Sequence, residues 1–302
     1  MDREKMTELE WKRSEKHATG YPQLRIHEIG ESCCLPLLHY PLLEEAGMAE
    51  ACFTTRLGGV SRQHLSELNL SFTRGDDPAR VEENYRRLSA AIGSRPAYFV
   101  STDQTHTTNV LQVGKKDRGN GVTRPRFWHD IDGLITDETE VVLSAYFADC
   151  VPLYFLDPVH RAIGLSHSGW RGTVNRMGRV TIEAMEKAYG SRPEDLLCAI
   201  GPSICQDCYE VSEDVALQFM EAFPGHEREI LIDKGRGKYQ LDLWESNRLL
   251  LLEAGIRADH LQVTDICTCC NPGLLFSHRA SKGRRGNLGA FIYLKDMTHE
   301  ND

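Results

Sequence analysis

Two histidines and one cysteine are the residues of this sequence most suited to chemistry: His106, Cys150 and His167. Their spacing matches no local zinc signature, but each borders an apolar run, and sites in α/β folds are commonly built at strand ends. Two imidazoles and a thiolate suit zinc, which takes nitrogen and sulfur ligands. Three protein ligands leave a fourth position in which zinc can lower the pKa of water to about 7. The three residues are therefore candidates for a catalytic zinc site, although composition alone favours ordinary core or loop residues at these positions.

The strands that must position these residues are predicted from apolar runs. The runs at 151–156 and 161–165 are continuous rather than alternating, which is typical of strands covered on both faces. Further strands are expected at 26–31 and 51–55, joined by a loop rich in proline and leucine.

Two helices are predicted around the same strands. Asp76, Asp77 and Pro78 begin the first, because aspartate caps free N–H groups and proline suits the first turn. The second begins at Thr173 and ends before Gly190. Helices and strands are intermixed without strict alternation, so we expect an α/β fold: a single-domain layered sandwich of mixed sheets covered by helices, over residues 25–302.

Composition and charge narrow the classes of function. The chain has 302 residues, 41% of them hydrophobic, and a net charge of −9, which does not suit a nucleic-acid-binding surface. No apolar run is long enough to cross a membrane, so no membrane partner is expected. Residues 1–24 are charged and lack the apolar segment of a secretory signal, which predicts a flexible N-terminal extension and a cytoplasmic protein.

A second group of cysteines allows three interpretations. Cys205/Cys208 and Cys267/Cys270 are two C-x-x-C pairs, the spacing of a Cys₄ zinc site, and Cys269 lies between the second two. A redox-sensitive thiol cluster is also consistent with them. The long stretch between the pairs favours the third interpretation, ordinary structural thiols.

Seven stretches of the sequence resemble, in order, the blocks of one known family. They are TTRLGGVS, LNLSFTRGDDPARVEENYRRL, DQTH, FADCVPLYF, HSGWRGT, AIGPSICQDCYEV and DICTCCNP…LFSHRASKGRRG. The family is the multicopper-oxidase-like, laccase-domain family, mostly described as purine nucleoside phosphorylases and also called peptidoglycan editing factors. The resemblance extends from about Ala51 to Leu294. The sequence departs from the family at Thr107, where glycine is common.

The resemblance implies both a site and an activity. It implies a zinc site made by His106, Cys150 and His167, and an active-site role for Arg56, which lies beside a glycine pair. It also implies phosphorolysis of adenosine, inosine and 5′-methylthioadenosine, together with deamination of adenosine. The expected partners are therefore purine nucleosides and phosphate.

Residues near His167 are expected to hold the phosphate. The stretch 168–173 predicts a helix N-terminus, which favours anions, so Ser168 and Arg171 are candidate contacts. Arg171 is equally consistent with a structural salt bridge. For Trp170, a place in the hydrophobic core is favoured over stacking on a purine base. Asp149 suits a structural or a catalytic role, and a structural role is favoured for Glu210.

Other functions remain open at this point. Cys150 paired with a histidine could act as the nucleophile of a peptidoglycan-editing amidase. Copper-dependent oxidation of phenols is the least favoured activity, and copper the less favoured metal, because only two histidines belong to the set. A metal-stabilised binding module without turnover is a non-enzymatic alternative. The sequence is compatible with either a monomer or a homodimer.

Overall fold

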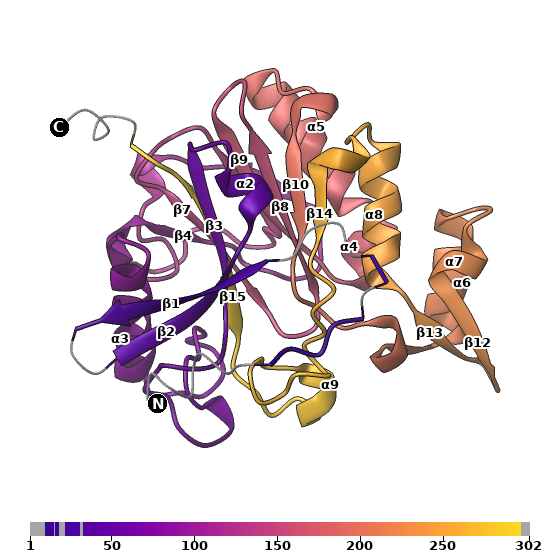
Figure 1. Ribbon diagram of the computed structural model, residues 1–302, viewed down its shortest axis with the longest axis horizontal. Coiled ribbons are helices and arrows are strands. Elements are labelled where there is room, and N and C mark those ends of the chain that lie inside the picture. The colour runs from indigo at the N-terminus through magenta and orange to yellow at the C-terminus, as the bar shows by residue number, and fades with distance from the viewer. Residues whose placement is uncertain (1–9, 15, 18–21, 31–32, 297–302) are drawn as a thin grey trace.

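Two mixed β-sheets packed face to face make up the body of the protein (Figure 1). The computed structural model describes residues 10–14, 16–17, 22–30 and 33–296. Helix α3 (Pro78–Ala91) covers the outer face of the first sheet, and α5 (Met177–Tyr189) and α8 (Leu243–Glu253) cover the outer face of the second. This four-layer arrangement confirms the predicted sandwich of sheets covered by helices.

Each sheet contains both parallel and antiparallel neighbours. The first has the order β1 (Gln23–Ile29), β2 (Cys33–His39), β3 (Ala49–Thr54), β15 (Leu288–Leu294), β7 (Val142–Phe147) and β4 (Phe99–Ser101). The second has the order β14 (Leu261–Val263), β10 (Leu197–Ile200), β8 (Val151–Asp157), β9 (Ala162–Ser168), β6 (Gly133–Thr136) and β5 (Val110–Gln112). Parallel pairs join β4 to β7, β5 to β6 and β10 to β14, and the remaining pairs are antiparallel.

The continuous apolar run of β8 serves two cores because side chains alternate across a strand. Leu153 and Phe155 pack among α5 and α8, whereas Tyr154 and Leu156 pack between the two sheets. All four are fully buried. The prediction that this strand is covered on both faces is therefore confirmed.

A small lobe projects beside α8 (Figure 1). It contains a three-stranded sheet and two helices: β11 (Glu210–Ser212), α6 (Glu213–Ala222), α7 (Glu227–Ile230), β12 (Leu231–Gly235) and β13 (Lys238–Leu241). Its strands are short and largely exposed, so they lack the apolar run that predicts a buried strand.

Two local expectations were wrong. Residues 33–39 form strand β2 rather than a loop, and Pro36 within it faces Ile26 of β1. Proline donates no ladder hydrogen bond, which makes such a strand hard to recognise. The helix expected from Thr173 is divided into α4 (Trp170–Val174) and α5, because Arg176 between them has a left-handed φ of 62°.

The described part of the expected N-terminal extension lies against the body. Lys12 and Asn271 exchange two hydrogen bonds, and the His17 N–H donates to the Asp265 carboxylate at 2.7 Å. Residues 1–9, 15 and 18–21 of that extension lie outside the described residues.

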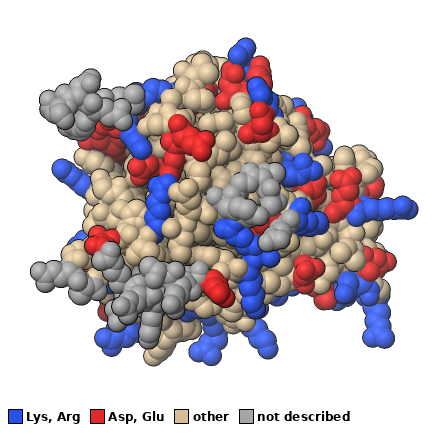
Figure 2. Space-filling model, in the orientation of Figure 1, with Lys and Arg blue, Asp and Glu red and all other residues tan. Residues whose placement is uncertain are grey.

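The face of the protein drawn in Figure 2 carries interspersed acidic and basic side chains, with no continuous basic surface among the described residues. None of the helices in the described part of the chain is long and apolar enough to span a membrane.

We expect the core on the helix side of the second sheet to dominate stability. Leu153→Ala removes a fully buried side chain and should lower the free energy of unfolding by about 2–5 kcal/mol. The matched control is Leu217→Ala on α6, whose leucine is 57% exposed and whose loss should change stability by less than about 0.5 kcal/mol. Denaturant unfolding measures both. Equal losses in the two variants would contradict this assignment of the core.

Candidate active site

Antiparallel pairing brings His106, Cys150 and His167 to one end of the second sheet. Strands β8 and β9 pair so that Pro152 faces His167, which places Cys150 beside the end of β9. Strand β9 also pairs with β6, so the residue before β6, Asp132, lies next to His167. His106 lies in the loop between β4 and β5.

The three side chains could share one metal ion. Their ligand atoms all lie within 4.8 Å of one another, and Cys150 Sγ is 4.0 Å from His106 Nε2. The two imidazole rings meet edge to face, with centroids 4.9 Å apart. The fold therefore brings together the two histidines and the cysteine that the sequence analysis singled out. Their nitrogen and sulfur donor atoms fit zinc.

Asp132 holds both histidines, and the sequence did not single it out. Its Oδ1 lies 2.7 Å from His167 Nδ1, which leaves Nε2 of that ring for a ligand bond. The same carboxylate accepts N–H bonds from Thr105, His106 and Thr107 at 2.9–3.2 Å. Its backbone oxygen accepts the N–H of His167 at 2.8 Å. The carboxylate thus fixes the ring of one ligand and the backbone of the other.

The electrostatics of the cluster favour a thiolate beside an imidazolium. Burial by itself would raise the pKa of Cys150, but the His167 and His106 imidazoles lower it to about 6. Burial by itself would lower the pKa of His167, but Cys150 and Asp132 raise it to about 9. Burial opposes ionisation of Asp132 as well, yet the bond from His167 and the backbone N–H groups keep its pKa below the usual value.

The backbone around the cluster is unusual in two ways. His106 and Asp149 both have left-handed φ values, 68° and 93°, which non-glycine residues seldom adopt and which occur often at functional sites. Gly169 packs directly against the ligands. A Cβ on this residue would lie 3.0 Å from the His106 ring and 3.1 Å from Cys150 Sγ, closer than an ordinary van der Waals contact, so these side chains would have to shift by a few tenths of an ångström.

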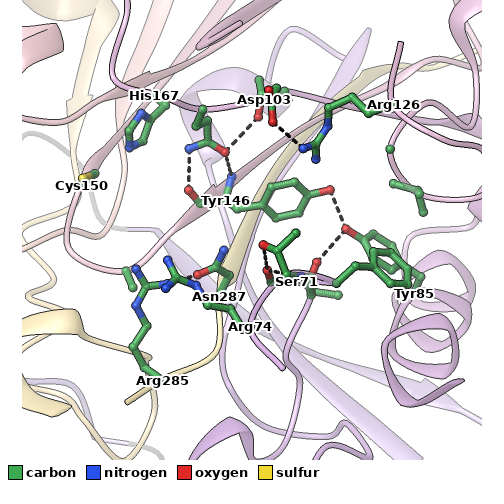
Figure 3. A pocket seen from close by; sticks show the side chains of 18 of the residues that line it. Ser71, Arg74, Tyr85, Asp103, Arg126, Tyr146, Cys150, His167, Arg285 and Asn287 are labelled. Carbon is green, nitrogen blue, oxygen red and sulfur yellow. Dashed lines mark hydrogen bonds and ion pairs between the residues drawn. The ribbon is translucent and has the colours of Figure 1, made fainter. Parts of the chain in front are cut away.

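A cavity of about 450 Å³ opens in front of the cluster. His106, Cys150 and His167 lie in its wall, and Arg74, Arg285 and Asn287 lie together at another part of it (Figure 3). Arg285 donates to Asn287, and its buried Nε has no hydrogen-bond partner among the described residues. Burial and the neighbouring Arg74 lower the pKa of Arg285 to about 10, so it stays protonated at neutral pH. Two adjacent guanidinium groups favour an anion in this part of the cavity.

The predicted binding residues lie in different places. Arg56 donates to the carbonyl oxygens of Ser66 and Pro272 and lines a neighbouring cavity that shares Arg285 with the main one. Ser168 is fully buried, and its hydroxyl contacts Thr173 and Asn247.

The remaining candidates mostly have structural contacts. The guanidinium of Arg171 stacks over the Trp170 ring at 4.2 Å, and Trp170 packs against the core. The Asp149 carboxylate accepts bonds from Thr268 and from the Arg279 N–H. Glu210 is exposed on β11 and is not among the residues that line the cavity.

The residues that sequence reasoning missed carried weak signals. Asp132 is a charged residue at the start of the apolar run GLIT, and nothing local shows that two histidines meet it. Arg285 belongs to the short basic cluster Lys282-Gly-Arg284-Arg285, and Arg74 belongs to the stretch SFTRGDD. Only the fold brings these two arginines to the same cavity.

Comparison with known proteins identifies the family of this chain. The family model described as "Multi-copper polyphenol oxidoreductase laccase" matches residues 50–295. The chain is 37% identical to "Purine nucleoside phosphorylase YlmD" of Bacillus subtilis over 250 residues, covering 82% of this chain and 88% of that one. It is 40% identical over 260 residues to "Purine nucleoside phosphorylase" of Deinococcus radiodurans, covering 86% and 93%.

A solved structure gives the same result for the fold. The crystal structure of YlmD from Geobacillus stearothermophilus superposes with a TM-score of 0.81 at 34% identity, covering 91% of this chain and all of that one. Fold, motifs and sequence identity agree along most of the chain, which therefore belongs to the laccase-like family described as multi-copper polyphenol oxidoreductase laccases, whose curated members include proteins named purine nucleoside phosphorylases.

Proposed function

We propose that this protein is a zinc-dependent purine nucleoside phosphorylase that acts on adenosine, inosine and 5′-methylthioadenosine in the cytoplasm. The observation that carries the proposal is the open cluster of His106, Cys150 and His167 in the wall of a cavity that also contains an arginine pair. A cavity of about 450 Å³ is within the usual size range of small-molecule sites. The printed names of the relatives in Bacillus and Deinococcus support the same activity.

Phosphorolysis needs an anion site and a water-poor cavity. A phosphate oxygen attacks the anomeric carbon of the ribose, the glycosidic bond breaks, and its electron pair leaves on the purine, which takes up a proton. We assign the phosphate to Arg74 and Arg285, because adjacent guanidinium groups match its charge and geometry. A zinc ion held by the two histidines and the cysteine would supply Lewis acidity in the same cavity.

The same site is our candidate for adenosine deamination. In that reaction water replaces the amino group on the purine ring and ammonia leaves. The three-ligand set supports this second activity, because it leaves a position open for water or substrate. Arg56, Arg171 and Ser168 stay as proposed binding residues of lower rank. Nε and Nη1 of Arg56 and the hydroxyl of Ser168 already bond within the protein, and Arg171 stacks over Trp170.

Turnover by the zinc-loaded protein tests the proposal. Inosine with phosphate should yield hypoxanthine and ribose 1-phosphate, and adenosine without phosphate should release ammonia. His106→Ala should lower kcat/KM at least about 100-fold, more than a typical change in an outer-shell partner. The control His129→Ala removes a histidine with an 82% exposed side chain and should change little. No turnover by the zinc-loaded wild type would refute the proposal.

The alternative of a cysteine nucleophile has one specific observation in its favour. The pKa of Cys150 near 6 makes it a thiolate at neutral pH, as nucleophilic cysteines require. Alkylation of the metal-free protein followed by an amidase assay distinguishes the two functions. Cleavage of amide bonds by metal-free protein, lost on alkylation, would favour the amidase over the phosphorylase.

The assigned phosphate site gives a separate prediction. Arg74→Ala should raise the KM for phosphate roughly 10- to 100-fold, the loss of about 1.5–3 kcal/mol from a charge-assisted hydrogen bond, while the KM for inosine changes little. Arg86→Ala on the exposed side of α3 serves as the matched control. Steady-state kinetics with each substrate varied in turn measures both constants. An unchanged KM for phosphate would place the anion elsewhere.

Zinc affinity should depend on pH in a defined window. Between pH 6 and 9 the metal-free pair holds one proton, on His167, and the zinc-bound pair holds none. The logarithm of the zinc association constant should therefore rise by about one per pH unit in this window, flatten above it, and fall more steeply below it as Cys150 also protonates. Competition with a coloured chelator measures the affinity. In Asp132→Asn the flattening should begin at a lower pH, because that carboxylate helps to raise the pKa of His167.

A further inference from the structure

Four cysteines outside the candidate active site form a second cluster: Cys205, Cys208, Cys267 and Cys270. Their sulfur atoms all lie within 4.8 Å of one another. Cys270 Sγ is 3.5 Å from Cys208 Sγ and 4.0 Å from Cys205 Sγ. Four sulfurs bound to one tetrahedral zinc at about 2.3 Å lie about 3.8 Å apart, a value between these two separations.

The fold explains why the two C-x-x-C pairs meet despite their separation in sequence. Strands β10 and β14 are parallel neighbours, so the loops that follow them leave the same end of the sheet. The loop after β10 carries Cys205 and Cys208, and the segment after β14 carries Cys267 and Cys270. An isolated bridge between Ser203 and Cys267 continues the pairing up to the cluster.

Two backbone N–H groups are placed to stabilise and orient Cys267 as a thiolate ligand. The backbone N–H groups of Cys205 and Cys270 both point to Cys267 Sγ at 3.3 Å. Hydrogen bonds to the charged form of a ligand favour that form and orient it. The sulfurs are not paired as disulfides, since the 3.5 Å separation far exceeds a bond of about 2.05 Å.

We propose that Cys205, Cys208, Cys267 and Cys270 bind a structural zinc ion. Four protein ligands leave no open position, which distinguishes this site from the three-ligand cluster at His106. The sequence favoured ordinary structural thiols because the pairs are far apart along the chain. Their convergence in space, at the spacing of two C-x-x-C pairs, favours the metal site instead.

The zinc would stabilise the connection between the small lobe and the second sheet, because its ligands come from the segment before β11 and from the segment after β14. Cys208 lies just before β11, and the carbonyl oxygens of Cys208 and Glu210 accept bonds from the Arg279 guanidinium at 2.9 and 3.0 Å. The Arg279 N–H and the Thr268 hydroxyl both donate to the Asp149 carboxylate, at 2.7 and 2.6 Å. Asp149 precedes Cys150, so the second cluster supports the backbone that presents a ligand of the first.

Metal analysis of the full chain, with the first site disabled, tests this proposal. His106→Ala protein grown with zinc should retain about one zinc per chain, held by the four cysteines. Adding Cys208→Ser should remove that zinc and lower the melting temperature. The matched control adds Cys269→Ser instead, because Cys269 lies in the same loop but outside the cluster, and it should keep both the zinc and the melting temperature.

Cobalt gives a second readout if Cys208→Ser does not fold. The His106→Ala chain reconstituted with cobalt should show strong sulfur-to-metal charge-transfer absorption and tetrahedral visible bands. Folded His106→Ala protein without zinc or a cobalt–thiolate spectrum would overturn the proposal, as would a Cys208–Cys270 disulfide or iron in place of zinc. Because none of these measurements depends on nucleoside turnover, a failure here is distinguishable from a failure of the proposed phosphorylase activity.

Discussion

The carboxylate of Asp132 is the interaction on which the candidate active site depends. It lies at the start of β6, where the pairing with β9 brings it to His167, and it also accepts the backbone N–H groups that shape the His106 loop. One buried anion therefore sets the ring orientation of one histidine and the position of the other. Its own ionised state depends on those same donors, so the three parts stabilise one another.

The sandwich supplies the rigid frame that this network needs. Strands β8 and β9 are buried along their whole length, so Cys150, which immediately precedes β8, and His167, which lies in β9, are held by a fully buried part of the sheet. The strained backbone at His106 and Asp149 can persist because neighbouring groups hold it in place. Gly169 lets the chain pass close to His106 and Cys150, where a Cβ would make tight contacts with both side chains.

Both clusters follow from the same property of mixed sheets. Antiparallel β8 and β9 bring the start of one strand to the end of the other, and parallel β10 and β14 send their following loops to the same edge. Side chains far apart in sequence meet at these edges. The first cluster faces a cavity and offers three potential ligand atoms, whereas the second offers four and lies near the joint to the lobe. This difference in the number of potential ligands is why we propose a catalytic role for the first cluster and a structural role for the second.

The sequence by itself determined the layers of the fold and pointed to His106, Cys150 and His167 as candidate ligands of one site. The apolar runs at β8 and β9 are long and continuous, and the blocks around His106, Cys150 and His167 are distinctive. Tertiary structure alone decided the role of Asp132, the meeting of Arg74 with Arg285, and the convergence of the two C-x-x-C pairs. These depend on strand pairing between distant segments, and local periodicity carries no information about which strands become neighbours.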